Sequence, residues 1–250
     1  MKTLGWIGCF ALLMTGCGPE HPKPLTAQDI VDRAIEASGG ERYTTSQIAF
    51  DFRDYHYEMK PSGQGRILKR SHEVDSGKVT DILQGKRFQR LLNGSPVKVP
   101  DSMAIKYSNS INSVHYFAYL PYGLNDPAVN KELLGEAHIG EQSYYKMRIT
   151  FDRHGGGKDY KDVYIYWFNK KTFVPDYLAY LYHVDGGGLR FRKAYNERQV
   201  GGIRFVDYKN YQADTLLPPV SLDSLYQAGK LELLSDIRLR NISVNPGSYN

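Results

Sequence analysis

The sequence has 250 residues, a formal net charge of +5 from 32 Lys and Arg against 27 Asp and Glu, and two cysteines. The basic surplus is small and no five like charges stand together, so a nucleic-acid-binding surface is not indicated. This length suits one all-β domain or two smaller domains. The 20 tyrosines are the compositional outlier; they suit strands, and also pockets for lipid or carbohydrate.

The first residues have the features of a bacterial export signal. Lys2 supplies a positive charge, and residues 4–14 are mostly apolar over a run too short to span a bilayer. The residues Leu13-Met14-Thr15-Gly16-Cys17 resemble a lipobox, with Met14 where leucine is usual. An ordinary signal peptide with a chance cysteine is the alternative.

We therefore expect a signal peptide over 1–16, a lipidated tether over 17–25 that begins at Cys17, and a single domain over 26–250. Cleavage leaves Cys17 as the remaining cysteine, so no intrachain disulfide is expected. The lipid would anchor a monomer to the bacterial envelope, at the outer membrane facing the periplasm.

Two helices are predicted. Thr26 followed by Asp29 is close to a capping box, and Gly39-Gly40 ends the apolar helical pattern, which gives a helix over 27–38. A second helix is expected over 101–119, with Asp101 capping its start. Its apolar stripe, spaced at three and four residues, consists of Met103, Tyr107, Ile111, Val114 and Ala118.

The rest of the chain alternates with a period of two. From Gln47 onward, one face carries Ile48, Phe50 and Phe52, and the other carries Asp51, Arg53 and Tyr55. Further strands are expected at 64–75, 78–84, 86–92, 132–139, 142–152, 160–168, 176–184, 189–197, 202–211 and 230–244. No βαβ alternation is present. The prediction is a mainly β (α+β) fold, a large curved antiparallel sheet or half-barrel with two covering helices.

The strand predicted at 160–168 is apolar on both faces. Val163, Ile165 and Trp167 form one face, while Tyr164, Tyr166 and Phe168 form the other. A sheet with one face in water alternates apolar with polar residues, so each face here has something to pack against. Ordinary core packing, a ligand cavity, a partner and the far wall of a barrel all fit, and Tyr164 and Tyr166 are candidate ligand-binding residues.

The chain resembles the LolA/LolB-like superfamily of bacterial envelope proteins. The similar features are the lipobox, the helix end Ala34-Ile35-Glu36-Ala37-Ser38-Gly39-Gly40 and the strands that start at Gln47. The resemblance implies an open antiparallel half-barrel closed by helices over an apolar cavity. Residues 162–211 also resemble uncharacterised lipoproteins of the Bacteroidetes group, which implies an envelope location and carries no activity.

Motifs of known catalytic chemistry are absent: there is no G-x-S-x-G, no H-E-x-x-H and no P-loop. We predict no catalytic residue, no metal and no cofactor. Two triple-glycine turns, at 155–157 and 186–188, should lie on one rim of an up-and-down sheet. They would gather His154, Asp159, His183 and Asp185 as candidate ligand-binding residues. Solvated hairpins are the alternative for this rim.

Three arginines of the second half, Arg190, Arg192 and Arg204, can share a sheet face and bind an anionic group, with a solvated face as the alternative. The leading functional hypothesis is an envelope lipoprotein that binds an apolar or amphipathic ligand, such as a lipid or acyl chain, in a sheet-lined cavity. An enzyme or glycan-binding protein with a polar site at the glycine rim is the second hypothesis. A structural or partner-binding envelope protein is the third.

Overall fold

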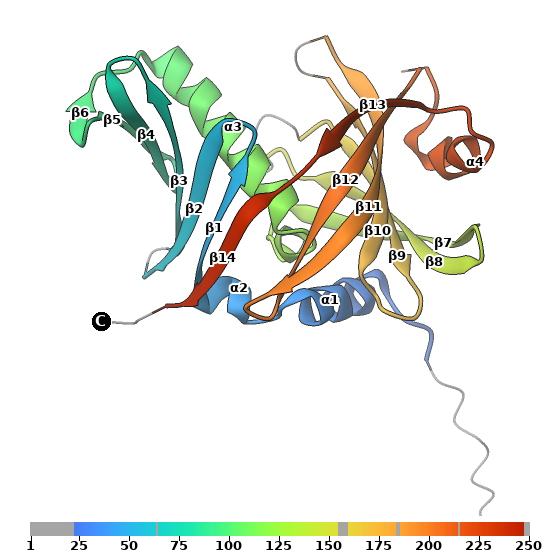
Figure 1. The fold of residues 1–250 in the computed structure, drawn as a ribbon. Coiled ribbons are helices and arrows are strands. Elements are labelled where there is room, and N and C mark those ends of the chain that lie inside the picture. Colours follow the sequence, from blue (N-terminus) through green and yellow to red (C-terminus); the bar gives the residue numbers. More distant parts are fainter. Residues whose placement is uncertain (1–22, 64, 155–159, 184–185, 215, 248–250) are drawn as a thin grey trace, which may run out of the picture.

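The computed structural model describes residues 23–63, 65–154, 160–183, 186–214 and 216–247. Its strands form two open, seven-stranded antiparallel sheets (Figure 1). The first sheet has the order β14-β1-β2-β3-β4-β5-β6, and the second has the order β13-β12-β11-β10-β9-β8-β7. The predicted class, a mainly β and antiparallel half-barrel, is confirmed, with two sheets in place of one.

The strands of the first sheet are β1 (Ser46–Phe52), β2 (Tyr55–Ser62), β3 (Gly65–Val74), β4 (Gly77–Gln84), β5 (Arg87–Leu92), β6 (Ser95–Val97) and β14 (Arg240–Pro246). Those of the second are β7 (Val129–Ile139), β8 (Gln142–Phe151), β9 (Val163–Asn169), β10 (Pro175–Tyr182), β11 (Gly188–Val200), β12 (Ile203–Ala213) and β13 (Glu232–Ile237). The helices are α1 (Ala27–Ser38), α2 (Arg42–Thr45), α3 (Asp101–Ala118) and α4 (Leu222–Gln227), with short 3₁₀ turns η1 (Tyr122–Asn125) and η2 (Pro219–Ser221).

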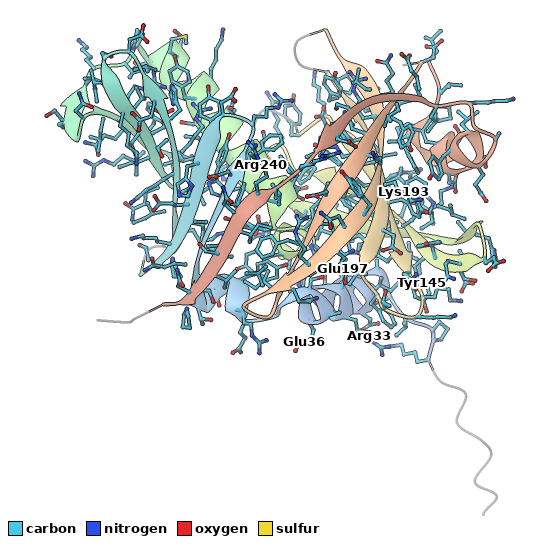
Figure 2. The ribbon with its side chains drawn as sticks, in the orientation of Figure 1. Arg33, Glu36, Tyr145, Lys193, Glu197 and Arg240 are labelled. Atoms are coloured by element: carbon cyan, nitrogen blue, oxygen red, sulfur yellow. The ribbon has the colours of Figure 1, made fainter. Side chains whose placement is uncertain are left out.

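Helix α1 begins and ends where the sequence predicts. The Asp29 backbone N–H donates to the Thr26 hydroxyl at 3.1 Å, and the Thr26 N–H donates to the Asp29 carboxylate at 2.8 Å, which completes the capping box. The helix buries Ile30, Val31 and Ala34 against the sheets. Its exposed face carries Glu36 and Arg33 (Figure 2), and the guanidinium carbon of Arg33 lies 5.0 Å from the ring centroid of Phe173.

Helix α3 confirms the second predicted helix, but Asp101 does not cap it. The N-cap is Pro100, without a side-chain hydrogen bond, and Asp101 is the acidic residue of the first turn. The helix packs on β3, β4 and β5 of the first sheet, and in Figure 1 it runs toward the centre of the molecule. Its C-terminal half thus reaches the space between the two sheets.

The strand predicted at 230–244 is two strands, each at the edge of a different sheet. β13 pairs with β12, and β14 pairs with β1. Between them, the buried Leu239 donates its backbone N–H to the Asp207 carboxylate at 3.0 Å, and Asp207 also accepts from Arg198 at 2.7 Å. This carboxylate fixes the point where the chain leaves one sheet for the other (Figure 1).

The alternation predicted through Tyr55 stops at Phe52. Arg53 has a φ of 55°, in the left-handed region, and lies in the tight turn between β1 and β2. Tyr55 opens the next strand, where it pairs with Phe52. The predicted shared face of Ile48, Phe50 and Phe52 on β1 is confirmed, and all three side chains are buried.

The second sheet is covered on both faces, as its two-sided apolar strands require. On the outer face, Ile165 and Trp167 pack in a cluster with Leu222 of α4, a helix that the sequence reading missed. The Asp223 carboxylate accepts from the Trp167 indole N–H at 3.0 Å and from Lys146 at 2.7 Å. These bonds hold α4 against the sheet. On the inner face, Tyr166 and Phe168 join the main core with α1 and the end of α3.

Candidate functional site

The inner face of the second sheet does not close completely against α3 and leaves a cavity of about 420 Å³. Its walls come from β9 and β10 on one side and from the C-terminal half of α3 with η1 on the other, and β3 adds Leu68. The predicted ligand-face residues Tyr164 and Tyr166 both line it. A volume of this size lies in the range of small-molecule sites.

Stacked tyrosine rings form one wall of the cavity. The Tyr164 ring stacks on that of Tyr180, with centroids 5.3 Å apart, and on that of Tyr166 at 6.3 Å. Phe151 meets Tyr164 edge to face at 5.7 Å. Each ring presents apolar area with few rotatable bonds, so the wall is preorganised for an apolar ligand.

Few charged groups line the cavity. Arg192 donates to the Tyr180 hydroxyl at 2.8 Å. The buried Asp162 accepts from the half-exposed His183 imidazole, with Nδ1 and Oδ1 3.1 Å apart. Asp126 also lines the space; desolvation raises the pKa of its carboxyl, and the charge of Arg66 opposes that rise. The lining is therefore mainly aromatic and aliphatic, and its charged side chains are those of Arg66, Asp126, Asp162 and Arg192.

His115 of α3 is a deeply buried ionisable group of the lining. Its Nε2 lies 3.3 Å from the Lys69 carbonyl oxygen, so Nε2–H is the donor there, and Nδ1 accepts from the Tyr119 hydroxyl at 3.0 Å. Burial lowers the pKa of His115 to about 3. The imidazole is neutral at physiological pH, and it joins α3 to the first sheet.

Residues 27–238 match the family described as "Family of unknown function (DUF6503)". The chain belongs to this family. A comparison with curated protein sequences finds no match.

A comparison with solved structures finds matches from several bacteria. A LolA superfamily protein from Nitrosomonas europaea has a TM-score of 0.51 at 14% identity, over 91% of this chain and 96% of that one. A DUF1329 family protein from Desulfovibrio piger ATCC 29098 has a TM-score of 0.41 at 11% identity, over 89% and 94% of the two chains. The lipoprotein LppX of Mycobacterium tuberculosis has a TM-score of 0.28 at 13% identity, over 64% and 89%. The first of these confirms that this DUF6503 member has the predicted LolA-like fold.

The strands that precede the two predicted glycine turns, β8 and β10, end at the same end of the second sheet; residues 155–157 themselves lie outside the described residues. β8, β9, β10 and β11 are consecutive antiparallel neighbours, so the β8–β9 and β10–β11 connections leave the sheet at the same end. Asp159 and Asp185 lie outside the described residues. Among the residues that are described, no group of three or more His, Cys, Asp or Glu side chains is placed to hold a metal ion.

His154 and His183 differ in their contacts at this rim. His183 hydrogen-bonds Asp162, a cavity-lining carboxylate that sequence reasoning did not single out. His154 lies in the turn that follows β8 and is exposed. A ligand role for either histidine stays a prediction. Asp162 directly precedes β9, and that position at a strand end was the available signal.

The three arginines expected to share a face have three different environments. Arg204 is buried and pairs with Glu197 at 2.7 Å. Arg190 donates to the Tyr182 hydroxyl at 2.9 Å but does not line the cavity. Arg192 lines it. Cys17, the predicted lipidation site, lies outside the described residues, and none of the helices in the described part of the chain is long and apolar enough to span a bilayer.

Acid should weaken the fold through His115. The pKa of about 3 in the folded state lies below the ordinary value of 6.5, so the unfolded chain binds more protons between these pH values. The free energy of unfolding therefore falls as the pH drops below about 6.5, by about 2 kcal/mol at pH 5 from this group alone. Urea unfolding at pH 7 and pH 5 measures the loss in wild type and in His115→Gln.

The variant should lose about 2 kcal/mol less than wild type over this pH interval, because glutamine does not titrate. His138→Gln, at an exposed position of β7, is the matched control for removal of an imidazole. Equal losses in wild type and His115→Gln would contradict the assignment.

Proposed function

We propose that this protein is an envelope lipoprotein that binds an apolar or amphipathic ligand, such as a lipid or acyl chain, in the cavity between α3 and the second sheet. The observation that carries the proposal is the cavity of about 420 Å³ with its wall of stacked tyrosines. An apolar ligand in this space would bury aromatic surface, which is favourable by roughly 25 cal/mol per Å² of apolar area removed from water.

The fold supports the same proposal. This chain shares a LolA-like architecture with the superfamily protein from Nitrosomonas europaea. Its cavity lies on the inner face of the half-barrel, where the sequence resemblance implies an apolar space. The residues proposed to contact the ligand include Tyr164 and Tyr166. His183 would hold Asp162 at one end of the cavity, with Asp159, Asp185 and His154 as further candidates on the same rim.

The anchoring part of the proposal concerns residues 1–25. Cleavage before Cys17 would place a lipid on that cysteine, and the tether over 17–25 would connect it to α1. The protein would then act as a membrane-anchored monomer at the outer membrane, facing the periplasm, with one domain over 26–250. The lipid supplies the membrane affinity in this proposal.

Filling the cavity should weaken ligand binding. Leu178 lines the cavity on β10, and Leu181 on the same strand packs into the outer-face cluster. Leu178→Trp should reduce the affinity for an apolar fluorescent probe such as N-phenyl-1-naphthylamine by at least roughly 10-fold, because the indole occupies the probe's space. Fluorescence titration measures the affinity.

Leu181→Trp is the matched control, since it adds the same indole to the opposite face. It should keep the wild-type affinity. Circular dichroism melting of both variants checks that they are folded. Undiminished probe binding by folded Leu178→Trp would contradict a ligand site in this cavity.

Removing the lipidated cysteine should release the protein from the membrane. Cys17→Ser removes the proposed attachment point for the lipid. The variant should move from the membrane fraction to the soluble fraction in cells that export it, measured by fractionation and immunoblotting after a high-salt wash. A variant that stays with the membrane after this wash would sink the anchoring proposal.

A further inference from the structure

Arg192 is a half-buried cation inside the cavity. It lies on β11 opposite Leu178 of β10. Its guanidinium carbon is 5.4 Å from the ring centroid of Phe117, 5.0 Å from that of Tyr180 and 6.0 Å from that of Tyr208. Three aromatic rings from α3, β10 and β12 thus surround one positive charge.

This charge has no carboxylate partner among the described residues. Among the other arginines of β11 and β12, Arg198 and Arg204 each form an ion pair at 2.7 Å, whereas Arg190 donates to the Tyr182 hydroxyl. Arg192 forms none, and its Nε is buried without a hydrogen-bond partner. Its Nη2 donates to a neutral group, the Tyr180 hydroxyl.

The acidic side chains of the lining have basic neighbours. Asp162 pairs with His183, and Asp126 lies in the field of Arg66. Lys193, the next residue of β11, lies on the opposite face toward α4, with Nζ 5.9 Å from the Tyr226 ring centroid (Figure 2). Arg192 differs from these lining charges, because its side-chain hydrogen bond and its ring contacts among the described residues are all with neutral groups.

Arginine keeps its proton in proteins, so the site cannot be relieved by deprotonation. Aromatic faces stabilise a guanidinium in part, but the unpartnered Nε–H is a donor without an acceptor. An anionic group with two oxygens would accept from the guanidinium in the bidentate geometry that arginine favours. An apolar ligand without such a group would leave the donor unsatisfied.

We propose that the ligand is an anionic amphiphile, a carboxylate or phosphate attached to an acyl chain, and that Arg192 binds its anionic group inside the cavity. The inference rests on the proposed function, since it presumes that the cavity takes a chain. The acyl chain would lie against the stacked rings of Tyr164, Tyr166 and Tyr180.

The test compares chain compounds that differ in charge. Isothermal titration of the purified protein with laurate, dodecyl phosphate, 1-dodecanol and acetate is carried out on wild type, Arg192→Gln, Arg192→Lys and Arg190→Gln. Arg190 is the matched control, because it donates to a tyrosine on the same strand pair but does not line the cavity. Thermal melting of each variant establishes that it is folded.

Wild type should bind at least one of the two anionic chains roughly 10- to 100-fold tighter than 1-dodecanol, the range of a charge-assisted hydrogen bond. The compound that shows this preference identifies the head group as carboxylate or phosphate. Arg192→Gln should bind the anion and the alcohol alike and keep the wild-type affinity for 1-dodecanol. Arg192→Lys should keep part of the preference, and Arg190→Gln should keep all of it.

Equal binding of the charged and uncharged chains by wild type would overturn the inference and leave the proposed function standing. A preference that survives in folded Arg192→Gln would also overturn it. Acetate binding as tight as laurate binding would indicate a site for small anions and would overturn the proposal that the ligand is an amphiphile. Failure of all three chain compounds to bind would count against the proposed function itself.

Discussion

The constraint on which this structure depends is that the central strands of the second sheet are apolar on both faces. Neither face of β9 can be left in water, since Ile165 and Trp167 lie on one side and Tyr166 and Phe168 on the other, all buried. The outer face is closed by α4, which Asp223 holds through Trp167 and Lys146. The inner face is shared between α1 and α3, and α3 also packs on the first sheet. Because α3 packs against both of these diverging sheets, it does not fill the space between them, and the cavity results.

The same arrangement determines the behaviour of polar groups inside. Burial near the cavity favours neutral forms, so His115 is held uncharged and the pKa values of the buried Tyr119 and Tyr166 are raised by desolvation. Arginine cannot respond in this way. Arg192 stays charged among aromatic rings, so this part of the cavity combines apolar surface with a positive charge. The charge distinguishes a site for an amphiphile from a site for a hydrocarbon.

Local signals in the sequence were sufficient for much of the fold. The capping box at Thr26 and Asp29 defined α1, the stripe through Ile111 and Ala118 defined most of α3, and glycine turns separated most hairpins. These features depend on neighbours within a few residues. The two-sided apolar pattern of β9 also pointed correctly to covering layers on both faces.

Long-range contacts account for what the sequence did not reveal. No glycine or proline marks the break between β13 and β14. The break depends instead on a long-range hydrogen bond, in which the Leu239 N–H donates to Asp207, more than thirty positions earlier. Helix α4 is six residues long, too short for a periodic pattern. Arg192 lines the cavity, whereas Arg204 is buried in an ion pair with Glu197. This difference depends on where Glu197 and the cavity lie in the fold, which the alternation of residues along one strand does not encode. The sequence also did not indicate His115 as a cavity residue, because its place in the lining depends on how α3 packs in the fold.

The central claim is that the cavity holds an amphiphile in the living cell. Native mass spectrometry of the protein, extracted gently from its own membrane, tests this most directly, with fragmentation of any bound species to identify its chain and head group. The account predicts one non-covalent adduct per chain, carrying an acyl chain and an anionic group, and absent from Leu178→Trp purified in parallel. A wild-type mass without any adduct, or an adduct retained in full by folded Leu178→Trp, would contradict it.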